Sequence, residues 1–268
     1  MVNSILDNLT PSDIISEIKL LMTANKDELI LLVEGLDDVK LFRPLFSEKV
    51  HLIKSGSKTN VDNIVSAIKN NRIIGIRDKD YSKKPKLKRI FYCDFCCAEM
   101  MIISFKDCFE RLYCDFYNGK ELPQNLKLTI LKQLEFISKL RMLNEQNTWN
   151  IKFDGIKVNR LYNKDIDIMN IGIVDEINKH NPSNILDKSR LNLLHNLPVL
   201  TNENELLYIT NGHDFIMLFS KICNECSLDQ IVKCLHGCFN QTIFSQTNLF
   251  QNIKKYQETN NYNILQSI

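Results

Sequence analysis

Three carboxylates follow short apolar runs in the first third of the chain. Glu34 comes directly after LILLV (29–33), and Asp78 and Asp80 come shortly after IIGI (73–76). Short apolar runs that end at turn residues are typical of buried parallel strands. Ligands of an open α/β sheet bind beyond the carboxyl ends of its strands. If the two strands are neighbours, all three carboxylates therefore meet at one edge of the sheet.

Carboxylates at such an edge have the chemistry of a divalent-metal site. Mg²⁺ prefers hard oxygen ligands and usually combines one or two carboxylates with water and phosphate oxygens, and Mn²⁺ accepts the same ligand type. Gly35 leaves space for an ion or a phosphate near the backbone. Each motif is short and frequent, and strand-ending acids also serve as solvated loop residues or helix caps. The combination predicts a metal site with Glu34, Asp78 and Asp80 as ligands.

The surrounding sequence alternates between strand-like and helix-like patterns. Strands are expected over 29–33, 50–53, 73–76 and 89–92, and helices over 10–25, 37–46, 61–70 and 98–117. Pro44 should kink the second helix or end it early. Strands that alternate with helices form βαβ units, which give a parallel sheet flanked by helices.

The pattern changes after about residue 105 and becomes mostly helical. Helices are expected over 123–145, 170–180, 184–195, 213–224 and 228–239, with one or two strands near 151–159 and 205–210. The sequence therefore predicts an α/β fold with two domains. Residues 1–105 would form the metal-binding domain with an N-terminal helix, and residues 106–268 a mostly helical domain.

Longer segments resemble a known fold family. LLVEG (31–35) followed by IIGIRDKD (73–80) resembles the TOPRIM domain, which topoisomerases, bacterial primases and OLD-type nucleases share. CDFCCAEMMI (93–102) is similar to the segment in which a glutamate opens the helix after the fourth strand. NGHDFIMLFS (211–220) is similar to a motif in the helical half of one TOPRIM-containing family, which includes the AriB toxin subunit of the PARIS phage-defence system. The TOPRIM resemblance covers about residues 27–105, and the family resemblance nearly the whole chain.

The resemblance implies a Mg²⁺-dependent nuclease with Glu34, Asp78 and Asp80 at its centre. Glu99 would be a fourth metal ligand, with helix capping as its alternative role. The resemblance also implies a partner ATPase of the ABC type that holds a toxic effector until a phage trigger appears, and cleavage of transfer RNA after release. The chain is too short to add the tyrosine-bearing domain of a topoisomerase or the template-binding apparatus of a primase. Water is therefore the expected nucleophile, and hydrolysis of RNA or DNA the expected reaction.

A basic segment lies around and after Asp80. Its candidate nucleic-acid-binding residues are Lys79, Lys83, Lys84, Lys86 and Lys88. Beside an acidic metal site, such a run would hold a phosphate backbone and steer it inward. Lys58, in the loop 56–60, is a further phosphate candidate. The alternative is a solvated surface loop, which is the usual role of a charge run.

Composition restricts the class of protein. The net charge is only +2, so affinity for nucleic acid must come from a local patch. No apolar stretch approaches the length of a membrane span, and the first ten residues lack the pattern of a secretory signal. The nine cysteines are odd in number and lie mostly in apolar segments, which favours the reduced cytoplasm. The sequence is compatible with a homodimer. The alternative function is a non-catalytic TOPRIM-fold subunit that docks on a partner ATPase or binds nucleic acid.

Two further motifs are interpreted as structural. Cys223, Cys226, Cys234 and Cys238 could bind zinc, but their spacing matches no common zinc motif and they fall in apolar helical segments, where free cysteine packs as a small hydrophobe. The segment 211–214 (NGHD) lies at an expected helix start, where Asn211 or Asp214 would cap the helix. Its similarity to the family motif favours instead a structural role that connects the two halves, and a catalytic His213 is a further alternative.

Overall fold

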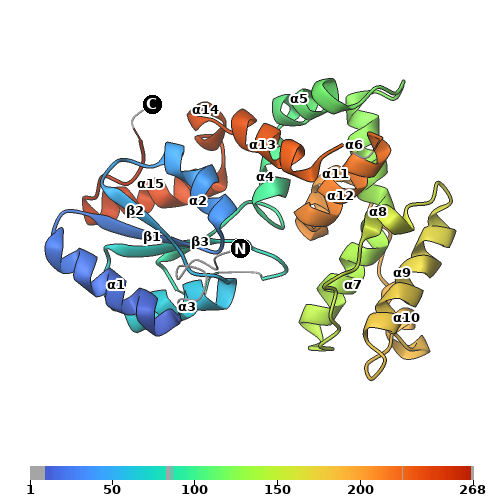
Figure 1. Ribbon diagram of the computed structural model, residues 1–268, viewed down its shortest axis with the longest axis horizontal. Helices are drawn as coiled ribbons and strands as arrows, with labels where there is room; N and C mark the ends of the chain where they lie inside the picture. Colours follow the sequence, from blue (N-terminus) through green and yellow to red (C-terminus); the bar gives the residue numbers. More distant parts are fainter. Residues whose placement is uncertain (1–9, 83–84, 86, 225, 267–268) are drawn as a thin grey trace, which may run out of the picture. The chain divides into compact units, whose positions relative to one another are not determined.

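The computed structural model describes residues 10–82, 85, 87–224 and 226–266 and divides into two compact units (Figure 1). Unit 1 contains the described residues of Met1–Asp94 and Phe239–Ile268, and unit 2 contains those of Phe95–Cys238. This division differs from the expected one, which placed the boundary after residue 105 and assigned the C-terminal segment to the helical domain.

Unit 1 is built on a four-stranded sheet in which all strands are parallel. Its order is β2-β1-β3-β4, from the strands β1 (Leu29–Val33), β2 (Val50–Lys54), β3 (Ile73–Arg77) and β4 (Ile90–Tyr92). Every residue of β1 and of β3 is buried, as expected for central strands with both faces covered. The predicted α/β class and the parallel sheet are confirmed, and the first and third strands are neighbours, which is the condition for the carboxylates to share one edge.

Helices cover both faces of this sheet (Figure 1). The helices of unit 1 are α1 (Pro11–Ala24), α2 (Leu36–Phe42), the 3-10 turn η2 (Arg43–Leu45), α3 (Lys58–Ala67), α14 (Gln241–Phe244) and α15 (Asn248–Asn260). One core forms where Ile14 and Ile18 of α1 and Ile64 of α3 pack against Ile30 of β1. Figure 1 shows α2 and α15 on the other face of the sheet.

Two local features set the bounds of these helices. The α-helix α2 ends at Phe42 and continues as a 3-10 turn through Pro44, as predicted for a proline at this place. Helix α3 spans Lys58–Ala67 instead of the predicted 61–70, because the Ser57 hydroxyl accepts the Asn60 amide proton and caps the helix three residues earlier. Lys58 is consequently the first residue of a helix and not part of a loop.

The C-terminal segment belongs to unit 1 because specific contacts tie it to β4 and to the residues just after β4. Asp94 accepts hydrogen bonds from the backbone amides of Asn248 (2.8 Å) and Leu249 (3.0 Å) and so caps the start of α15. Tyr256 packs edge-on against Phe91 of β4, with ring centroids 5.6 Å apart. Helical periodicity predicts a helix but not the core against which it packs, so the sequence did not reveal this return.

Unit 2 is helical, which confirms a mostly helical remainder. Its helices are α4 (Ala98–Ser104), α5 (Lys106–Phe116), α6 (Pro123–Gln133), α7 (Glu135–Gln146), α8 (Val158–Leu161), α9 (Ile166–His180), α10 (Lys188–His195), α11 (Glu203–Ile209), α12 (Gly212–Ile222) and α13 (Leu228–Cys238). The strands predicted near 151–159 and 205–210 are wrong. Most of the second segment lies in α11, which Asn202 caps by accepting the Asn204 amide proton, and short apolar runs do not distinguish strand from helix.

Within the residues that the structure describes, none of the helices has the length and apolar character needed to cross a bilayer.

Candidate metal and phosphate site

Glu34 occupies a fixed position at the carboxyl end of β1. Its carbonyl accepts the amide proton of Gly56 (2.8 Å), and the next residue, Gly35, donates its amide proton to the Asp38 side chain (2.8 Å) at the start of α2. The side chain of Glu34 turns toward the neighbouring strand, where Oε1 accepts the backbone amide proton of Asp78 (2.9 Å). The end of β1 and the chain leaving β3 therefore meet through a hydrogen bond between two of the predicted site residues.

The surroundings of Glu34 disfavour its negative charge. Burial is the largest effect and, despite the hydrogen bond from the Asp78 amide, raises the pKa of this carboxyl from 4.5 to about 7. The neighbouring carboxylates of Asp80 and Asp38 add to the rise. Burial and, to a smaller extent, the two nearby carboxylates thus oppose the negative charge of Glu34, while Arg77 favours it.

Asp80 is held by Lys58 at the edge of this environment. The Lys58 ammonium lies 2.8 Å from Oδ2 of Asp80, and both side chains are partly exposed. Asp80 adopts a left-handed backbone conformation (φ 47°), which aspartate tolerates better than most residues and which belongs to the turn after β3. The sequence placed Lys58 among the phosphate candidates but gave no sign that it pairs with a site carboxylate.

Arg77 was missed by the sequence analysis and anchors the end of β3. The side chain is 7% exposed, and its Nε lies 3.5 Å from Oδ1 of Asp62 on α3. The guanidinium donates a hydrogen bond to the Tyr92 hydroxyl (3.0 Å) and lies 4.8 Å from the centre of that ring. An arginine inside an otherwise apolar strand was the available signal, because a buried charge requires a partner. Arg77 fixes the backbone from which Asp78 and Asp80 extend.

The donor set of unit 1 fits a hard divalent cation in its chemistry. Glu34, Asp78 and Asp80 offer only carboxylate oxygens, and Mg²⁺ needs one or two of them beside water and substrate oxygens. In the described part of unit 1, however, no three Asp, Glu, His or Cys residues have ligand atoms all within 4.8 Å of one another. The fold thus brings the three predicted residues to one sheet edge without arranging their side chains as a closed set of ligands.

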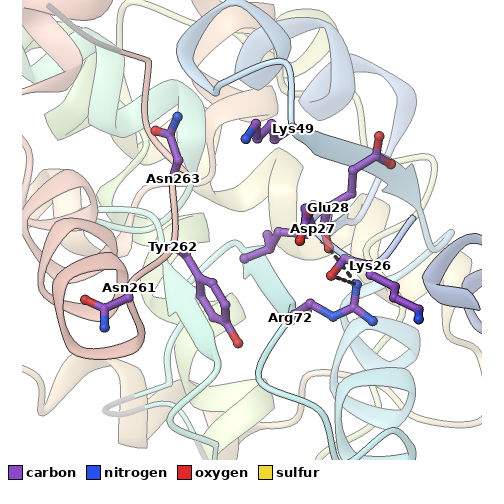
Figure 2. A pocket seen from close by; sticks show the side chains of 9 residues that line it. Lys26, Asp27, Glu28, Lys49, Arg72, Asn261, Tyr262 and Asn263 are labelled. Carbon is purple, nitrogen blue, oxygen red and sulfur yellow. Dashed lines mark hydrogen bonds between the residues drawn. The ribbon is translucent and has the colours of Figure 1, made fainter. Parts of the chain in front are cut away.

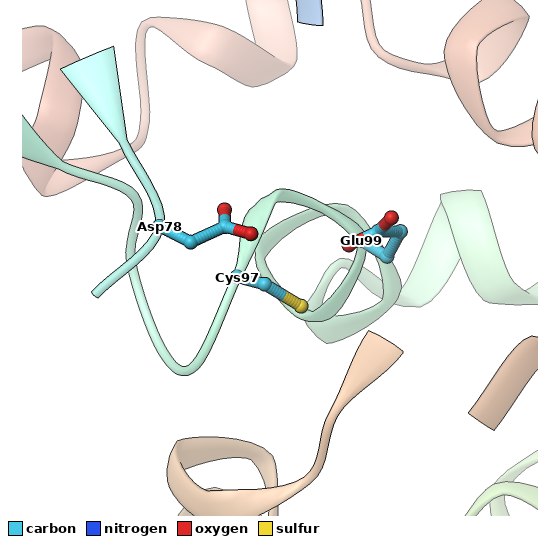
Figure 3. Close-up of side chains that lie close together, drawn as sticks. All are labelled: Asp78, Cys97 and Glu99. Carbon is cyan, nitrogen blue, oxygen red and sulfur yellow. The ribbon is translucent and has the colours of Figure 1, made fainter. Parts of the chain in front are cut away.

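Glu99 lies in unit 2, in the first turn of α4 (Figure 3). Figure 3 also draws Cys97, the residue before this helix, and Asp78, which belongs to unit 1. Gly212 packs closely against the start of α4, because a Cβ at this position would lie 2.6 Å from Oε2 of Glu99 and 2.8 Å from Sγ of Cys97. The glycine of the NGHD segment is therefore required for the packing around Glu99 within unit 2.

The remainder of the NGHD segment has the predicted capping role. Asn211 accepts the Asp214 amide proton (3.2 Å) and caps α12. Asp214 is fully buried and forms two hydrogen bonds with Arg141, at 2.9 and 3.1 Å. Burial raises the pKa of Asp214, and Arg141 opposes the rise. His213 is exposed, and its proposed connecting or catalytic role remains a prediction.

The basic residues around Asp80 are described only in part. The Lys79 carbonyl accepts the Ser82 amide proton (3.0 Å) in the turn after β3, and Lys88 is exposed. Three of the predicted phosphate-binding residues lie outside the described residues, namely Lys83, Lys84 and Lys86. A role of these lysines in binding nucleic acid remains a prediction.

The cysteines near α12 and α13 are consistent with packing. Burial raises the pKa of the Cys223 thiol to about 12, and that of the Cys234 thiol to about 12 as well. Over the part of unit 2 that the structure describes, no three residues of the metal-binding types bring their ligand atoms within 4.8 Å of one another.

A hollow in unit 1 lies at the edge of the sheet opposite the carboxylates (Figure 2). It has a volume of about 320 Å³ and is lined by residues that precede β1, β2 and β3, among them Glu28, Lys49 and Arg72. Arg72 donates hydrogen bonds to the carbonyls of Asn25 (2.8 Å) and Lys26 (2.7 Å) after the end of α1. Its guanidinium thus holds the chain together at this edge, and the hollow is separate from the carboxylates.

No family model matches this chain, and no match was found among the curated proteins. The TOPRIM resemblance therefore rests on the sequence motifs, and the parallel sheet agrees with it at the level of fold class.

Proposed function

We propose that this chain is a TOPRIM-like nuclease that hydrolyses nucleic-acid phosphodiesters with Mg²⁺ or Mn²⁺. Glu34, Asp78 and Asp80 are the metal ligands and catalytic residues, and Glu99 is a fourth ligand. The observation that carries the proposal is the 2.9 Å hydrogen bond between the Glu34 carboxylate and the Asp78 amide, because it joins the two acidic motifs across neighbouring parallel strands. The carboxyl edge of such a sheet is where ligands bind.

Each candidate site residue has a separate role in the proposed hydrolysis. A bound divalent cation would neutralise the phosphodiester and lower the pKa of a water molecule. Glu34, whose pKa lies near 7, is suited to accept a proton at neutral pH as well as to bind a cation. Asp78 and Asp80 supply the remaining negative charge. Lys58 and Lys79, with Lys83, Lys84, Lys86 and Lys88, hold the phosphate backbone of the substrate.

The family resemblance extends this proposal to a biological role. The chain would be the toxic effector of an anti-phage defence system that acts in the cytoplasm, and its substrate would be RNA, transfer RNA included, or DNA. A partner ATPase of the ABC type would restrain it until infection. Self-association as a homodimer is compatible with this role.

A second function is favoured by one specific observation. Lys58 neutralises Asp80, and the described carboxylates of unit 1 do not form a closed ligand set. A non-catalytic subunit that keeps the fold and docks on an ATPase or on nucleic acid would also show this arrangement.

Cleavage assays with the purified protein separate the two functions. Transfer RNA, single-stranded RNA and duplex DNA are incubated with Mg²⁺, with Mn²⁺ or with a chelator. The nuclease proposal expects metal-dependent cleavage by the wild type that falls at least ~100-fold in Glu34→Gln and Asp78→Asn, since each loses a charged group at the reacting centre. Glu17→Gln, at an exposed position of α1, is the matched control and should cleave normally.

Expression in cells covers the case in which activity depends on a cellular factor. Toxicity of the wild type that disappears in Asp78→Asn but persists in Glu17→Gln supports the nuclease. Equal growth of all three strains, together with intact nucleic acid in the cleavage assay, would support the non-catalytic subunit.

A further inference from the structure

Lys58 is placed at the carboxyl edge of the sheet by a rigid local structure. Gly56 makes the turn after β2 with φ 89°, a conformation that favours glycine, and Ser57 caps α3. The Asn60 side chain donates a hydrogen bond to the Ser55 carbonyl (2.8 Å) and closes the turn. The backbone of Lys58 is therefore fixed, and its side chain connects α3 to the chain after β3 through Asp80.

The ion pair between Lys58 and Asp80 is suited to exchange. The Lys58 side chain is 39% exposed and that of Asp80 is 23% exposed, so water replaces each partner at little cost. A cation that binds Asp80 competes with the ammonium for the same carboxylate and repels it. A phosphate group competes with Asp80 for the ammonium. Binding of either ligand thus weakens the ion pair and frees the group that binds the other ligand.

We propose that Lys58 is an exchangeable counter-ion, which occupies Asp80 in the absence of substrate and transfers to a nucleic-acid phosphate when a divalent cation binds. The inference rests on the proposed function, since it takes Asp80 as part of the metal site and a phosphodiester as the ligand. The exchange would regulate the metal site by making cation binding depend on nucleic acid. Cation and nucleic acid bind cooperatively, because each removes the ion pair that opposes the other, and the coupling is equal in both directions.

The cooperativity is measured by calorimetric titration of the full chain with Mg²⁺. The titration is done with and without a short 2′-O-methyl RNA oligonucleotide, which keeps the phosphodiester backbone, and a gel checks that it stays intact. For the wild type we expect the oligonucleotide to raise Mg²⁺ affinity about fivefold. In Lys58→Met, Mg²⁺ affinity without oligonucleotide should already be about fivefold higher, and the oligonucleotide should add little, because the partly exposed pair is absent.

Two variants complete the design. Lys69→Met removes the same charge just beyond the other end of α3, at an exposed position, and should behave as the wild type. Lys58→Gln removes the charge with a polar side chain and should behave as Lys58→Met, which preserves the test if the methionine variant fails to fold. Circular dichroism confirms the fold of each variant.

The result that overturns the inference is distinct from the failure of the proposed function. If the wild type binds and uses Mg²⁺ but Lys58→Met shows the same affinity and the same gain from the oligonucleotide, Lys58 does not exchange and this inference alone is wrong. If the wild type takes up no divalent cation with or without oligonucleotide and cleaves nothing, the metal site and the inference fall together.

Discussion

Replacing Glu34 with glutamine should stabilise the protein at alkaline pH. Burial raises the pKa of Glu34 from 4.5 to about 7, so the folded state opposes ionisation of this carboxyl. The difference corresponds to about 3 kcal/mol at about 1.4 kcal/mol per pH unit, and partial solvent exposure reduces it to about 2 kcal/mol. Glutamine resembles the protonated acid and keeps an oxygen that can accept the Asp78 amide proton. Glu34→Gln should therefore gain about 2 kcal/mol at pH 8.

The stability difference between Glu34→Gln and the wild type should depend on pH. Below pH 4.5 Glu34 is protonated in both the folded and the unfolded chain, so the variant and the wild type should be equally stable. Between pH 4.5 and about 7 the folded state binds more protons than the unfolded state, so the stability of the wild type falls as the pH rises. The advantage of the variant should grow over this window and stay constant above it.

Urea unfolding at pH 5 and at pH 8 in the presence of a chelator measures the effect. Because the midpoint can refer to unit 1 alone, the signal should come from a probe in that unit. Glu17→Gln, at an exposed position of α1, is the control for loss of one negative charge and should shift little at either pH. A Glu34→Gln variant that is equally stable or less stable than the wild type at pH 8 would refute the reasoning, because Glu34 would then be ionised without cost.

Three further predictions concern the structure that supports the site. Arg77→Met should destabilise the protein by about 2 kcal/mol in urea unfolding, since it removes the hydrogen bond to Tyr92 and the cation beside the partly buried Asp62; an unchanged midpoint would contradict the anchoring role. Gly75→Ala should cost about 1–3 kcal/mol by the same measurement, because the new Cβ would lie 2.5 Å from Cγ1 of Val61, and an unchanged midpoint would show that α3 moves freely. Asp94→Ala should cost about 1 kcal/mol and increase hydrogen exchange at the first turn of α15, whereas unchanged exchange there would argue against the cap.

The central strands and their acids were predictable for one physical reason. A strand with both faces covered must be apolar throughout, so β1 and β3 appear in the sequence as short apolar runs. Parallel strands place their carboxyl ends at one edge, so the sequence could assign Glu34 and the acids after β3 to a common edge, on the condition that the two strands are neighbours. Their roles in metal binding and catalysis remain predictions.

Other features could not be predicted because they depend on contacts between distant segments. Arg77 pairs with Asp62 across β3 and α3, and no local pattern marks the partner of a buried charge. The return of α15 to β4 depends on Asp94 and on Phe91 meeting residues more than 150 positions away. The wrong prediction of a strand near 205–210 has a local cause. The apolar segment is too short for its periodicity to distinguish the helix α11 from a strand.

The side chains at the acidic edge of the sheet do not maximise the stability of the folded protein. A neutral residue in place of Glu34 would avoid the cost of burying a negative charge. A more buried cation would pair with Asp80 more strongly than the partly exposed Lys58 does. Elsewhere in unit 1, the buried strands, the helix caps and the packing of Gly75 of β3 against α3 all favour the same fold. Local conflicts in an otherwise consistent fold are expected where a residue serves a ligand instead of stability. A divalent cation that stabilises the wild type at pH 8, but not Glu34→Gln, would show that Glu34 serves a bound cation at this edge and not the stability of the fold.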